Sequence, residues 1–375
     1  MIADSPLGVI YTPYLSRAIR RVAVQHATNV HNLYNIKLIP REFLNPPRDL
    51  HMTTKRDFLS VTDITPSETI VLLNRARTAK SISSEDNNSK PLAGKSIAIL
   101  FDKPSLRTRV SFQVGIEHLG GFSVFLGQQE VGLGNREPTS DVAKVLSGYV
   151  DCIVARLSDH QLLLDLAKYA SVPVINALSD LEHPCQVMAD LLTIYEHKDK
   201  LEGLSLAYIG DGNNVARSLC LVAPAVGMNF TSASPDGYNL DEQSVQKAKS
   251  RANALSVQIR TLTDPVKAVA GADVVYTDVW ASMGQEDETG IRQSAFNGYT
   301  VDSVLMSKAN PGALFMHDMP AHYGEEIPSG MLEHPQSVAF PQAHNRLHAQ
   351  KTILEFLING ICAILSRILR TQSQS

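Results

Sequence analysis

Short apolar, β-rich runs alternate with helical patterns along most of this chain of 375 residues. The runs form two series, the first at 96–100, 123–126, 152–155 and 172–176, and the second at 204–209, 229–233, 257–260, 274–277 and 313–316. Alternation at this spacing is typical of parallel strands, because each parallel pair needs a crossover between its strands. The sequence therefore predicts an α/β fold with two lobes, each a parallel sheet flanked by helices.

The length of the chain also favours two domains, since single cores rarely grow beyond about 250–300 residues. We expect a first lobe at 52–190, a second lobe at 191–342, and a C-terminal helix at 343–375 that packs back on the first lobe. Residues 1–51 differ from the rest, with five basic residues and one acid up to Arg41. They are similar to an organelle presequence, or they lie upstream of a true start at Met52, and both interpretations stay open.

The charge and the cysteine content argue against several classes of protein. The net charge of −4 gives no basic surface for nucleic acid. The four cysteines are far apart and form no C-x-x-C pair, which disfavours a disulfide framework or a zinc site and favours a reducing compartment. The stretch closest to a membrane span, at 356–366, is too short to cross a bilayer. We expect a cytoplasmic protein, or a mitochondrial matrix protein if residues 1–51 are a presequence.

A cluster of hydroxyl and guanidinium groups follows the first apolar run, where a helix begins. It comprises Ser105, Arg107, Thr108 and Arg109. The N-terminus of a helix presents unpaired N–H groups and the positive end of its dipole to an anion. Arginine adds a planar cation that binds phosphate through two parallel hydrogen bonds. The cluster predicts a phosphate site, and the alternative is a solvated helix cap with two surface arginines.

Further polar residues follow later runs, and parallel strands bring their carboxyl ends to one edge of a sheet. Arg156 ends the run at 152–155, and Arg346 lies at the start of the last helix. His183 precedes a proline suited to the first helical position, and Gln186 lies one turn on. A neutral imidazole and an amide can both donate to a carbonyl oxygen. The alternative for His183 is a helix cap.

A glycine pair at Gly210 and Gly212 follows the run at 204–209 and suggests a dinucleotide fingerprint. Val215 stands where the third glycine of that fingerprint belongs, and no clear acidic residue ends the next run. Dinucleotide binding is therefore disfavoured. Asn213 and Asn214 instead offer amides to a polar ligand.

The run at 274–277 is followed by Asp278, Ser282 and Met283. A carboxylate, a hydroxyl and a backbone N–H at one strand end suit a zwitterionic amino acid, with Asp278 on its ammonium group and the Met283 N–H on its carboxylate. The alternative is a side-chain capping turn. His317 and Asp318 follow the last run and could pass for a metal pair, but no third ligand stands at a suitable spacing, so no metal is expected.

Three motifs in this order resemble the aspartate/ornithine carbamoyltransferase family. They are Ser105-Leu-Arg-Thr-Arg109, His183-Pro-Cys-Gln186 and Asp278-Val-Trp-Ala-Ser-Met-Gly284, the last similar to the ornithine-type signature. The resemblance covers roughly residues 57–369. It implies an active site in the cleft between two lobes, a homotrimer or a multiple of trimers, and no organic cofactor.

The resemblance also implies a role for each matching position. Carbamoyl phosphate would be held by Ser105, Leu106, Arg107, Thr108, Arg109, Arg156, His183, Gln186, Asp318, Met319 and Arg346. L-Ornithine would be held by Asn214, Asp278, Ser282 and Met283. The catalytic residues would be Arg156, His183 and Asp318. The expected reaction forms L-citrulline and phosphate, a step of arginine metabolism. Alternatives are another amine acceptor, such as acetylornithine or putrescine, or a catalytically silent ligand-binding paralogue.

The sequence departs from the family pattern at three positions. Asp318 stands where the family has a cysteine beside the reacting amine, which suggests that its carboxylate accepts a hydrogen bond from the amine, or takes its proton, in place of the thiol. The alternative is that the Asp318 side chain turns away and only its backbone matters. Gly132 occupies a position where many relatives have a glutamine or histidine that reaches into the neighbouring subunit. Gln113 replaces a frequent glutamate after the phosphate motif.

Overall fold

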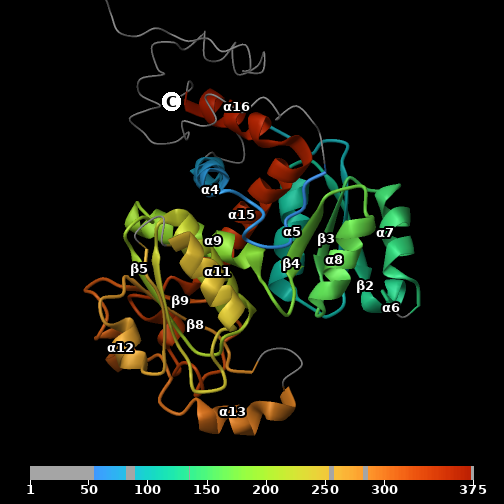
Figure 1. Cartoon of the computed structure of the whole chain (residues 1–375). Coiled ribbons are helices and arrows are strands. Elements are labelled where there is room, and N and C mark those ends of the chain that lie inside the picture. The colour runs from blue at the N-terminus through green and yellow to red at the C-terminus, as the bar shows by residue number, and fades with distance from the viewer. Residues whose placement is uncertain (1–54, 82–88, 135, 253–256, 282–285, 373–375) are drawn as a thin grey trace, which may run out of the picture.

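The computed structural model describes residues 55–81, 89–134, 136–252, 257–281 and 286–372. Its first lobe contains a four-stranded parallel sheet in the order β2-β1-β3-β4 (Figure 1). The strands are β1 (Ser96–Phe101), β2 (Phe122–Gly127), β3 (Cys152–Arg156) and β4 (Val174–Leu178). The second lobe contains a five-stranded parallel sheet in the order β7-β6-β5-β8-β9. Its strands are β5 (Ser205–Ile209), β6 (Asn229–Ala233), β7 (Ile259–Leu262), β8 (Val274–Thr277) and β9 (Leu314–His317). The predicted fold class is confirmed.

Helices connect and cover both sheets. In the first half of the chain they are α4 (Pro66–Ser81), α5 (Leu106–His118), α6 (Gln128–Val131), α7 (Thr139–Ser147), α8 (His160–Tyr169) and α9 (Pro184–Lys198). In the second lobe they are α10 (Asn214–Val222), η1 (Ala223–Val226), α11 (Glu242–Ala252), α12 (Pro265–Val269), η2 (Glu286–Glu288), α13 (Thr289–Ala295), α14 (Ser303–Met306) and η3 (Met331–Glu333). The chain ends in α15 (Ala339–Asn359) and α16 (Ile361–Gln372). Among the described helices, none is long and apolar enough to cross a membrane.

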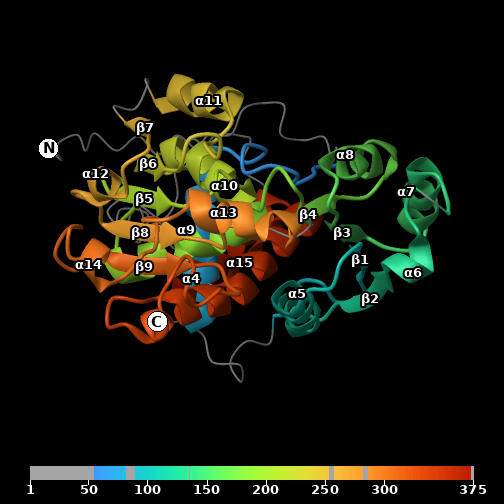
Figure 2. The same ribbon diagram turned by 90° about the horizontal axis from the view of Figure 1, so that it is seen from below.

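Helices α9 and α15 lie between the two sheets, α4 packs against both of them, and α16 packs on α4 and α15 at one end of the molecule (Figures 1 and 2). Helix α15 also packs on α5 and β9. One hydrophobic core runs through these helices and reaches both sheets, from Ile97 and Ile99 on β1 to Leu206 and Tyr208 on β5. The lobes therefore share a buried spine.

The C-terminal region differs in detail from the sequence-based expectation of one helix. It forms two helices, because Gly360 takes a left-handed φ of 78° at the end of α15. The predicted boundary at residue 190 falls inside α9, which continues through it. That boundary and the other domain limits stay predictions.

Each sheet has one point where the strand order reverses. In the first sheet it lies between β1 and β3, and in the second it lies between β5 and β8. Crevices open at such points beyond the carboxyl ends of the strands, because the two connections leave toward opposite sides. The polar motifs follow these strands, so both reversal points contribute to one site.

Candidate active site

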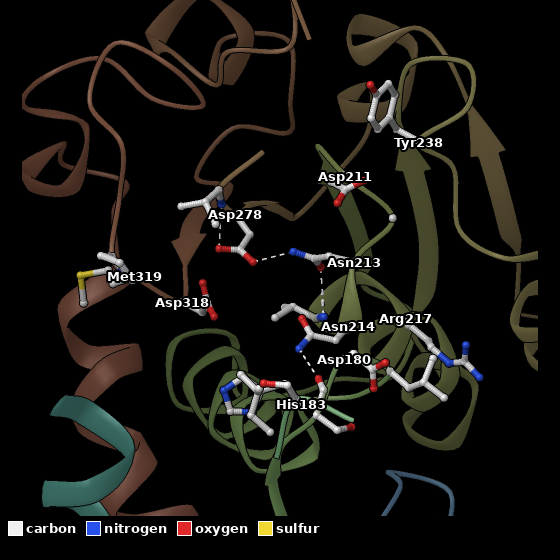
Figure 3. A pocket seen from close by; sticks show the side chains of 18 of the residues that line it. Asp180, His183, Asp211, Asn213, Asn214, Arg217, Tyr238, Asp278, Asp318 and Met319 are labelled. Carbon is white, nitrogen blue, oxygen red and sulfur yellow. Dashed lines mark hydrogen bonds between the residues drawn. The ribbon is translucent and has the colours of Figure 1, made fainter. Parts of the chain in front are cut away.

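A cavity of about 1080 Å³ lies between the carboxyl ends of the two sheets. The first lobe lines it with Ser105, Leu106, Arg107, Arg156 and His183, among others. The second lobe adds Asn213, Asn214, Asp278, Asp318 and Met319 (Figure 3). Helix α15 adds Arg346. The cavity thus brings together residues that are far apart in the sequence, from Ser105 to Arg346.

Three guanidinium groups converge on the cavity near the start of α5. Thr108 is fully buried, and its hydroxyl accepts hydrogen bonds from Arg346 Nη2 at 2.6 Å and from Arg156 Nη1 at 3.4 Å. Arg107 lines the same end, and its Nε and the Nε of Arg346 are buried without a hydrogen-bond partner. Burial and the neighbouring Arg346 lower the pKa of Arg156 to about 10, so it stays charged at neutral pH. Such a cluster is suited to a phosphate dianion.

The hydroxyl of Ser105 is available to a ligand. Ser105 is the N-cap residue of α5 with an extended φ of −155°, and its side chain makes no capping hydrogen bond. The N–H groups of the first helical turn face the same end of the cavity as the arginines, and the helix dipole adds to their field. The phosphate motif therefore lies where the sequence predicted, at a strand-to-helix turn.

Arg109 lies differently from its motif neighbours. Its guanidinium stacks on the ring of Phe125, 3.7 Å from the ring centroid, and its Nε donates to Gln113 Oε1 at 3.2 Å. Arg109 is exposed and does not line the cavity. Its predicted phosphate role stays a prediction. Gln113 is suited to its position because its amide oxygen accepts this bond.

The second motif forms the start of α9, as the sequence predicted. His183 is the N-cap residue, Pro184 takes the first helical position, and the His183 N–H donates to Ser218 Oγ at 2.9 Å. Burial, followed by Arg346 and Arg156, lowers the pKa of His183 well below its usual value, so the imidazole is neutral. Its Nδ1 is buried without a partner. Gln186 is fully buried one turn further on and is not among the residues that line the cavity, so its predicted contact with the ligand stays a prediction.

The second lobe presents polar groups from the ends of β5 and β8. Asn213 caps α10 through its amide oxygen and donates its Nδ2 to Asp278 Oδ2 at 2.6 Å. Asp278 also accepts the Val279 N–H at 2.8 Å. The neighbouring Asn214 lines the cavity and donates to the Ser179 carbonyl at 2.6 Å (Figure 3). Ser282 and Met283, also predicted to bind the amino acid, lie outside the described residues.

Gly212, the second glycine of this region, allows a close approach of two backbone segments. A Cβ on Gly212 would lie 2.4 Å from the Leu240 nitrogen and 2.5 Å from the Asn239 carbonyl carbon. Only glycine therefore lets the 237–240 segment approach the end of β5. This contact accounts for Gly212 without a dinucleotide.

Asp278 and Asp318 face each other across the second-lobe side of the cavity (Figure 3). One oxygen of each carboxyl group and one nitrogen of His317 lie within 4.8 Å of one another. Burial raises the pKa of both carboxyl groups, and the charge of Asp318 raises that of Asp278 further. Two carboxylates this close hold one proton between them, and they titrate as a pair. Asp318 Oδ1 has no hydrogen-bond partner.

His317 fixes the backbone beside this pair. Its Nδ1 accepts the Met319 N–H at 2.9 Å, so its Nε2 carries the proton and donates to Glu326 Oε1 at 3.2 Å. These bonds hold Met319 in a left-handed conformation, with φ of 57°. The three groups have the composition of a metal site, which the sequence spacing did not reveal. Both imidazole nitrogens are already engaged, however, so the arrangement is better suited to proton exchange than to metal ligation.

The sequence analysis missed part of the cavity wall. Asp211 and Arg292 form an ion pair of 3.0 Å that lines the second-lobe side of the cavity. Burial raises the pKa of Asp211 to about 6. Arg292 also donates to the Trp280 carbonyl at 2.8 Å. Asp211 stands between the two glycines after β5, a position that could have identified it. Arg292 comes from α13 and has no such sequence signal.

Taken together, the fold and the site define a two-lobed α/β enzyme that binds a phosphate-bearing ligand at one lobe and an amine-bearing ligand at the other. A model of the aspartate/ornithine carbamoyltransferase carbamoyl-P binding domain matches residues 56–196, and a model of the Asp/Orn binding domain matches residues 202–357. The chain belongs to the aspartate/ornithine carbamoyltransferase family.

Relatives in sequence and in structure agree with this assignment. The chain is 46% identical over 306 residues to an ornithine carbamoyltransferase of Pyrococcus abyssi, and this match covers 82% of the present chain and 96% of the relative. It is 50% identical over 298 residues to an ornithine carbamoyltransferase of Methanobrevibacter smithii, and this match covers 80% of the present chain and 98% of the relative. The solved ornithine carbamoyltransferase from Pyrococcus furiosus matches with a TM-score of 0.79 at 46% identity, covering 82% of this chain and 98% of that one.

Proposed function

We propose that the protein transfers the carbamoyl group of carbamoyl phosphate to the δ-amine of L-ornithine, giving L-citrulline and phosphate. The observation that carries this proposal is the pairing of opposite charges across one cavity. Three arginines gather at the first lobe, and the Asp278–Asp318 pair faces them from the second. A phosphate and an amine bound at these two ends would bring the carbamoyl carbon and the δ-nitrogen together, and such positioning removes much of the barrier.

The residues around the carbamoyl group are suited to stabilising charge on its oxygen. In the proposed reaction the δ-nitrogen bonds to the carbonyl carbon, the oxygen gains negative charge, and the bond from carbon to the phosphate oxygen then breaks. Arg156, the neutral His183 and the Thr108 hydroxyl would surround that oxygen as donors. Arg107 and Arg346 would keep the departing phosphate. Ser105 and Leu106 at the start of α5 would bind it through their hydroxyl and N–H groups.

Asp318 is the proposed proton acceptor. The δ-ammonium of ornithine resembles that of lysine, with a pKa near 10, so it must lose a proton before it attacks. The Asp318 carboxylate would take this proton: its Oδ1 has no hydrogen-bond partner, and its raised pKa makes it a stronger base than an ordinary carboxylate. Asp278 and Asn214 would bind the α-amino acid end, together with Ser282 and Met283. Met319 would present its backbone to the carbamoyl group.

We also propose that the protein assembles as a homotrimer or a multiple of trimers, as the family resemblance implies. Apolar side chains on neighbouring surfaces of α5 and β2 support a second copy as the occupant. Leu106 and Phe122 are 75% and 65% exposed, and Val110 and Val124 lie beside them on the same elements. Patches of this kind mark interfaces between proteins. Because Leu106 also lines the cavity, a neighbouring subunit at this surface would border the site.

The proposed location is the cytoplasm, with the mitochondrial matrix as the location if residues 1–51 act as a presequence. Fractionation of cells that express the full chain, with and without residues 1–51, distinguishes the two. Enrichment in mitochondria that depends on residues 1–51 would indicate the matrix.

The experiment that tests the function is citrulline formation by the purified protein with carbamoyl phosphate and each of four acceptors, namely ornithine, acetylornithine, putrescine and aspartate. We expect turnover with ornithine alone. Turnover with acetylornithine or putrescine instead would assign a different acceptor. A folded protein that binds carbamoyl phosphate but forms no product with any acceptor would be a silent paralogue, and the proposed function would be wrong.

A further inference from the structure

A chain of buried hydrogen bonds joins the two halves of the site beneath the cavity. It runs from the His317 N–H on β9, through Gln342 on α15 and Asp190 on α9, to Gln186 at the start of α9. All four residues are fully buried. The proposed reaction assigns no role to Asp190 or Gln342.

The direction of every bond in this chain is fixed by its first member. A backbone N–H can only donate, so the group that meets the His317 nitrogen at 2.9 Å is the amide oxygen of Gln342. Gln342 must therefore turn its Nε2 away from that bond. Its Nε2 donates to Asp190 Oδ1 at 2.8 Å and to the Tyr276 hydroxyl at 2.9 Å.

Asp190 in turn fixes which end of the Gln186 amide group faces it. Because Oδ1 of Asp190 already accepts from Gln342, the group of Gln186 that meets it at 2.8 Å must be the donor Nε2. Burial raises the pKa of Asp190 to about 7, but a proton on this carboxyl group does not reverse the order. Oδ1 faces two N–H donors, so the proton would sit on Oδ2, which lies 3.1 Å from the Tyr276 hydroxyl.

The amide oxygen of Gln186 is then left without a partner. Within the described chain, Gln186 Oε1 is buried and accepts no hydrogen bond, and it lies one helical turn from His183, whose Nδ1 is also unpartnered. A buried acceptor without a donor costs about 1–3 kcal/mol. The –NH₂ of a carbamoyl group is such a donor, whereas a methyl group of similar size is not.

We propose that Asp190 is a positioning residue, which turns the amide oxygen of Gln186 toward the carbamoyl nitrogen and so makes the site select carbamoyl phosphate over acyl phosphates without an –NH₂. This inference rests on the proposed function and corrects one detail of the sequence-based expectation. Gln186 accepts from the carbamoyl nitrogen, and it does not donate to the carbonyl oxygen.

The test compares equilibrium binding of carbamoyl phosphate and acetyl phosphate, which differ only in –NH₂ against –CH₃. We expect the wild-type protein to prefer carbamoyl phosphate by about tenfold or more, since acetyl phosphate leaves the Gln186 oxygen unpaired. Asp190→Ala should bring the ratio of the two dissociation constants close to one. Asp190→Asn should keep the preference, because its amide oxygen can still accept from both glutamines while its Nδ2 meets the Tyr276 hydroxyl.

Two further variants separate positioning from general loss of structure. Tyr276→Phe removes the third contact of Asp190 but leaves the Oδ1 bonds, so the preference should persist. Gln186→Met removes the acceptor itself and should abolish the preference for carbamoyl phosphate. This test can be made even if Asp190→Ala does not fold. A wild-type ratio near one, or an undiminished ratio in folded Asp190→Ala, would overturn the inference. Failure of the wild-type protein to bind carbamoyl phosphate at all would instead contradict the proposed function.

Discussion

Individual side chains in this site have roles that depend on their partners more than on their motif. Within one five-residue motif, Thr108 is buried under two guanidinium groups, whereas Arg109 stacks on Phe125 outside the cavity. Asp318 replaces a family cysteine, yet its neighbour Asp278 and its burial give it a raised pKa. The proposed result of the replacement is a proton acceptor of a different kind at the same place.

Replacement of Asp318 tests that role. Asp318→Asn keeps the shape of the side chain but cannot accept the proton, so kcat/KM for ornithine should fall by about 10²–10⁴-fold. Asp318→Cys should retain more activity, with the acidic limb of the pH profile moved to higher pH because a thiol has a higher ordinary pKa than a carboxyl group. Steady-state citrulline assays across pH measure both effects. The exposed Glu333→Gln variant is the control, and an unchanged pH profile in Asp318→Asn would rule out the base role.

The same pair of carboxyl groups should make stability depend on pH. Because burial raises the pKa of Asp278 and Asp318, the folded protein holds a proton that the unfolded chain has already released above its ordinary carboxyl pKa. Stability from this pair is therefore lost as pH rises from about 4 toward the raised values. Asp318→Asn should raise the melting temperature at pH 8 by about 2 °C or more and have less effect at pH 4. Calorimetry at both pH values, with the exposed Glu117→Gln as control, would reveal a pH-independent change if this reasoning is wrong.

At the scale of secondary structure, local sequence fixes where several elements begin and end. Thr65 and Glu68 form a reciprocal cap at the start of α4, with bonds of 2.9 and 3.2 Å. Asn213 caps α10 and also holds Asp278, which ties a helix start to the site. Gly132, the second departure from the family pattern, ends α6 in a left-handed conformation with φ of 56°. It serves as a helix cap where relatives have a longer side chain.

The close approach at Gly212 gives a prediction for one such element. Gly212→Ala places a Cβ about 2.4 Å from the Leu240 nitrogen, so the β5–α10 turn or the 237–240 segment must shift. We expect a loss of roughly 1–3 kcal/mol in unfolding free energy and a higher KM for ornithine. Gly290→Ala is the matched control, because its Cβ meets nothing within 4 Å and it lies in helix α13. Urea titration of both variants measures the difference, and equal stabilities would contradict the packing role.

At the scale of the whole molecule, the site exists only because the carboxyl ends of the two sheets face one cavity. Helices α9 and α15 connect the lobes and share one core; His183 at the N-cap of α9 and Arg346 on α15 line the cavity. The proposed phosphate end of the cavity lies beyond the reversal point between β1 and β3, and the proposed amine end lies beyond the one between β5 and β8. A shift of one lobe would change the distance between the arginines and the carboxyl pair, because the two groups come from different lobes.

The exposed apolar surface of α5 and β2 gives a prediction at this scale. Phe122→Asp places a charge on that surface and should convert the proposed trimer into smaller species, with lower activity because Leu106 borders both the surface and the cavity. Val266→Asp, at a half-exposed position on α12 in the other lobe, is the control and should leave the mass unchanged. Sedimentation or light scattering measures the mass. A monomeric wild-type protein would contradict the proposed assembly.

Much of this protein follows from its sequence alone, because the relevant signals are local. The strand-helix alternation predicts two parallel sheets, and polar residues after buried strands predict the edge where ligands bind. The starts of α4, α5 and α9 can be read from Thr65, Ser105 and His183 together with the residues that follow. Family motifs then supply the reaction.

Only the tertiary structure decided which groups meet. The Asp278–Asp318 pair, the Asp211–Arg292 ion pair and the Gln342–Asp190 bond each join residues from separate elements. Such contacts leave no periodic signal, since each depends on how elements far apart in the sequence pack together. Burial then sets the charge states, because a carboxyl group loses water only when the fold encloses it. The sequence determined the parts of the site, and tertiary packing between distant elements determined their chemistry.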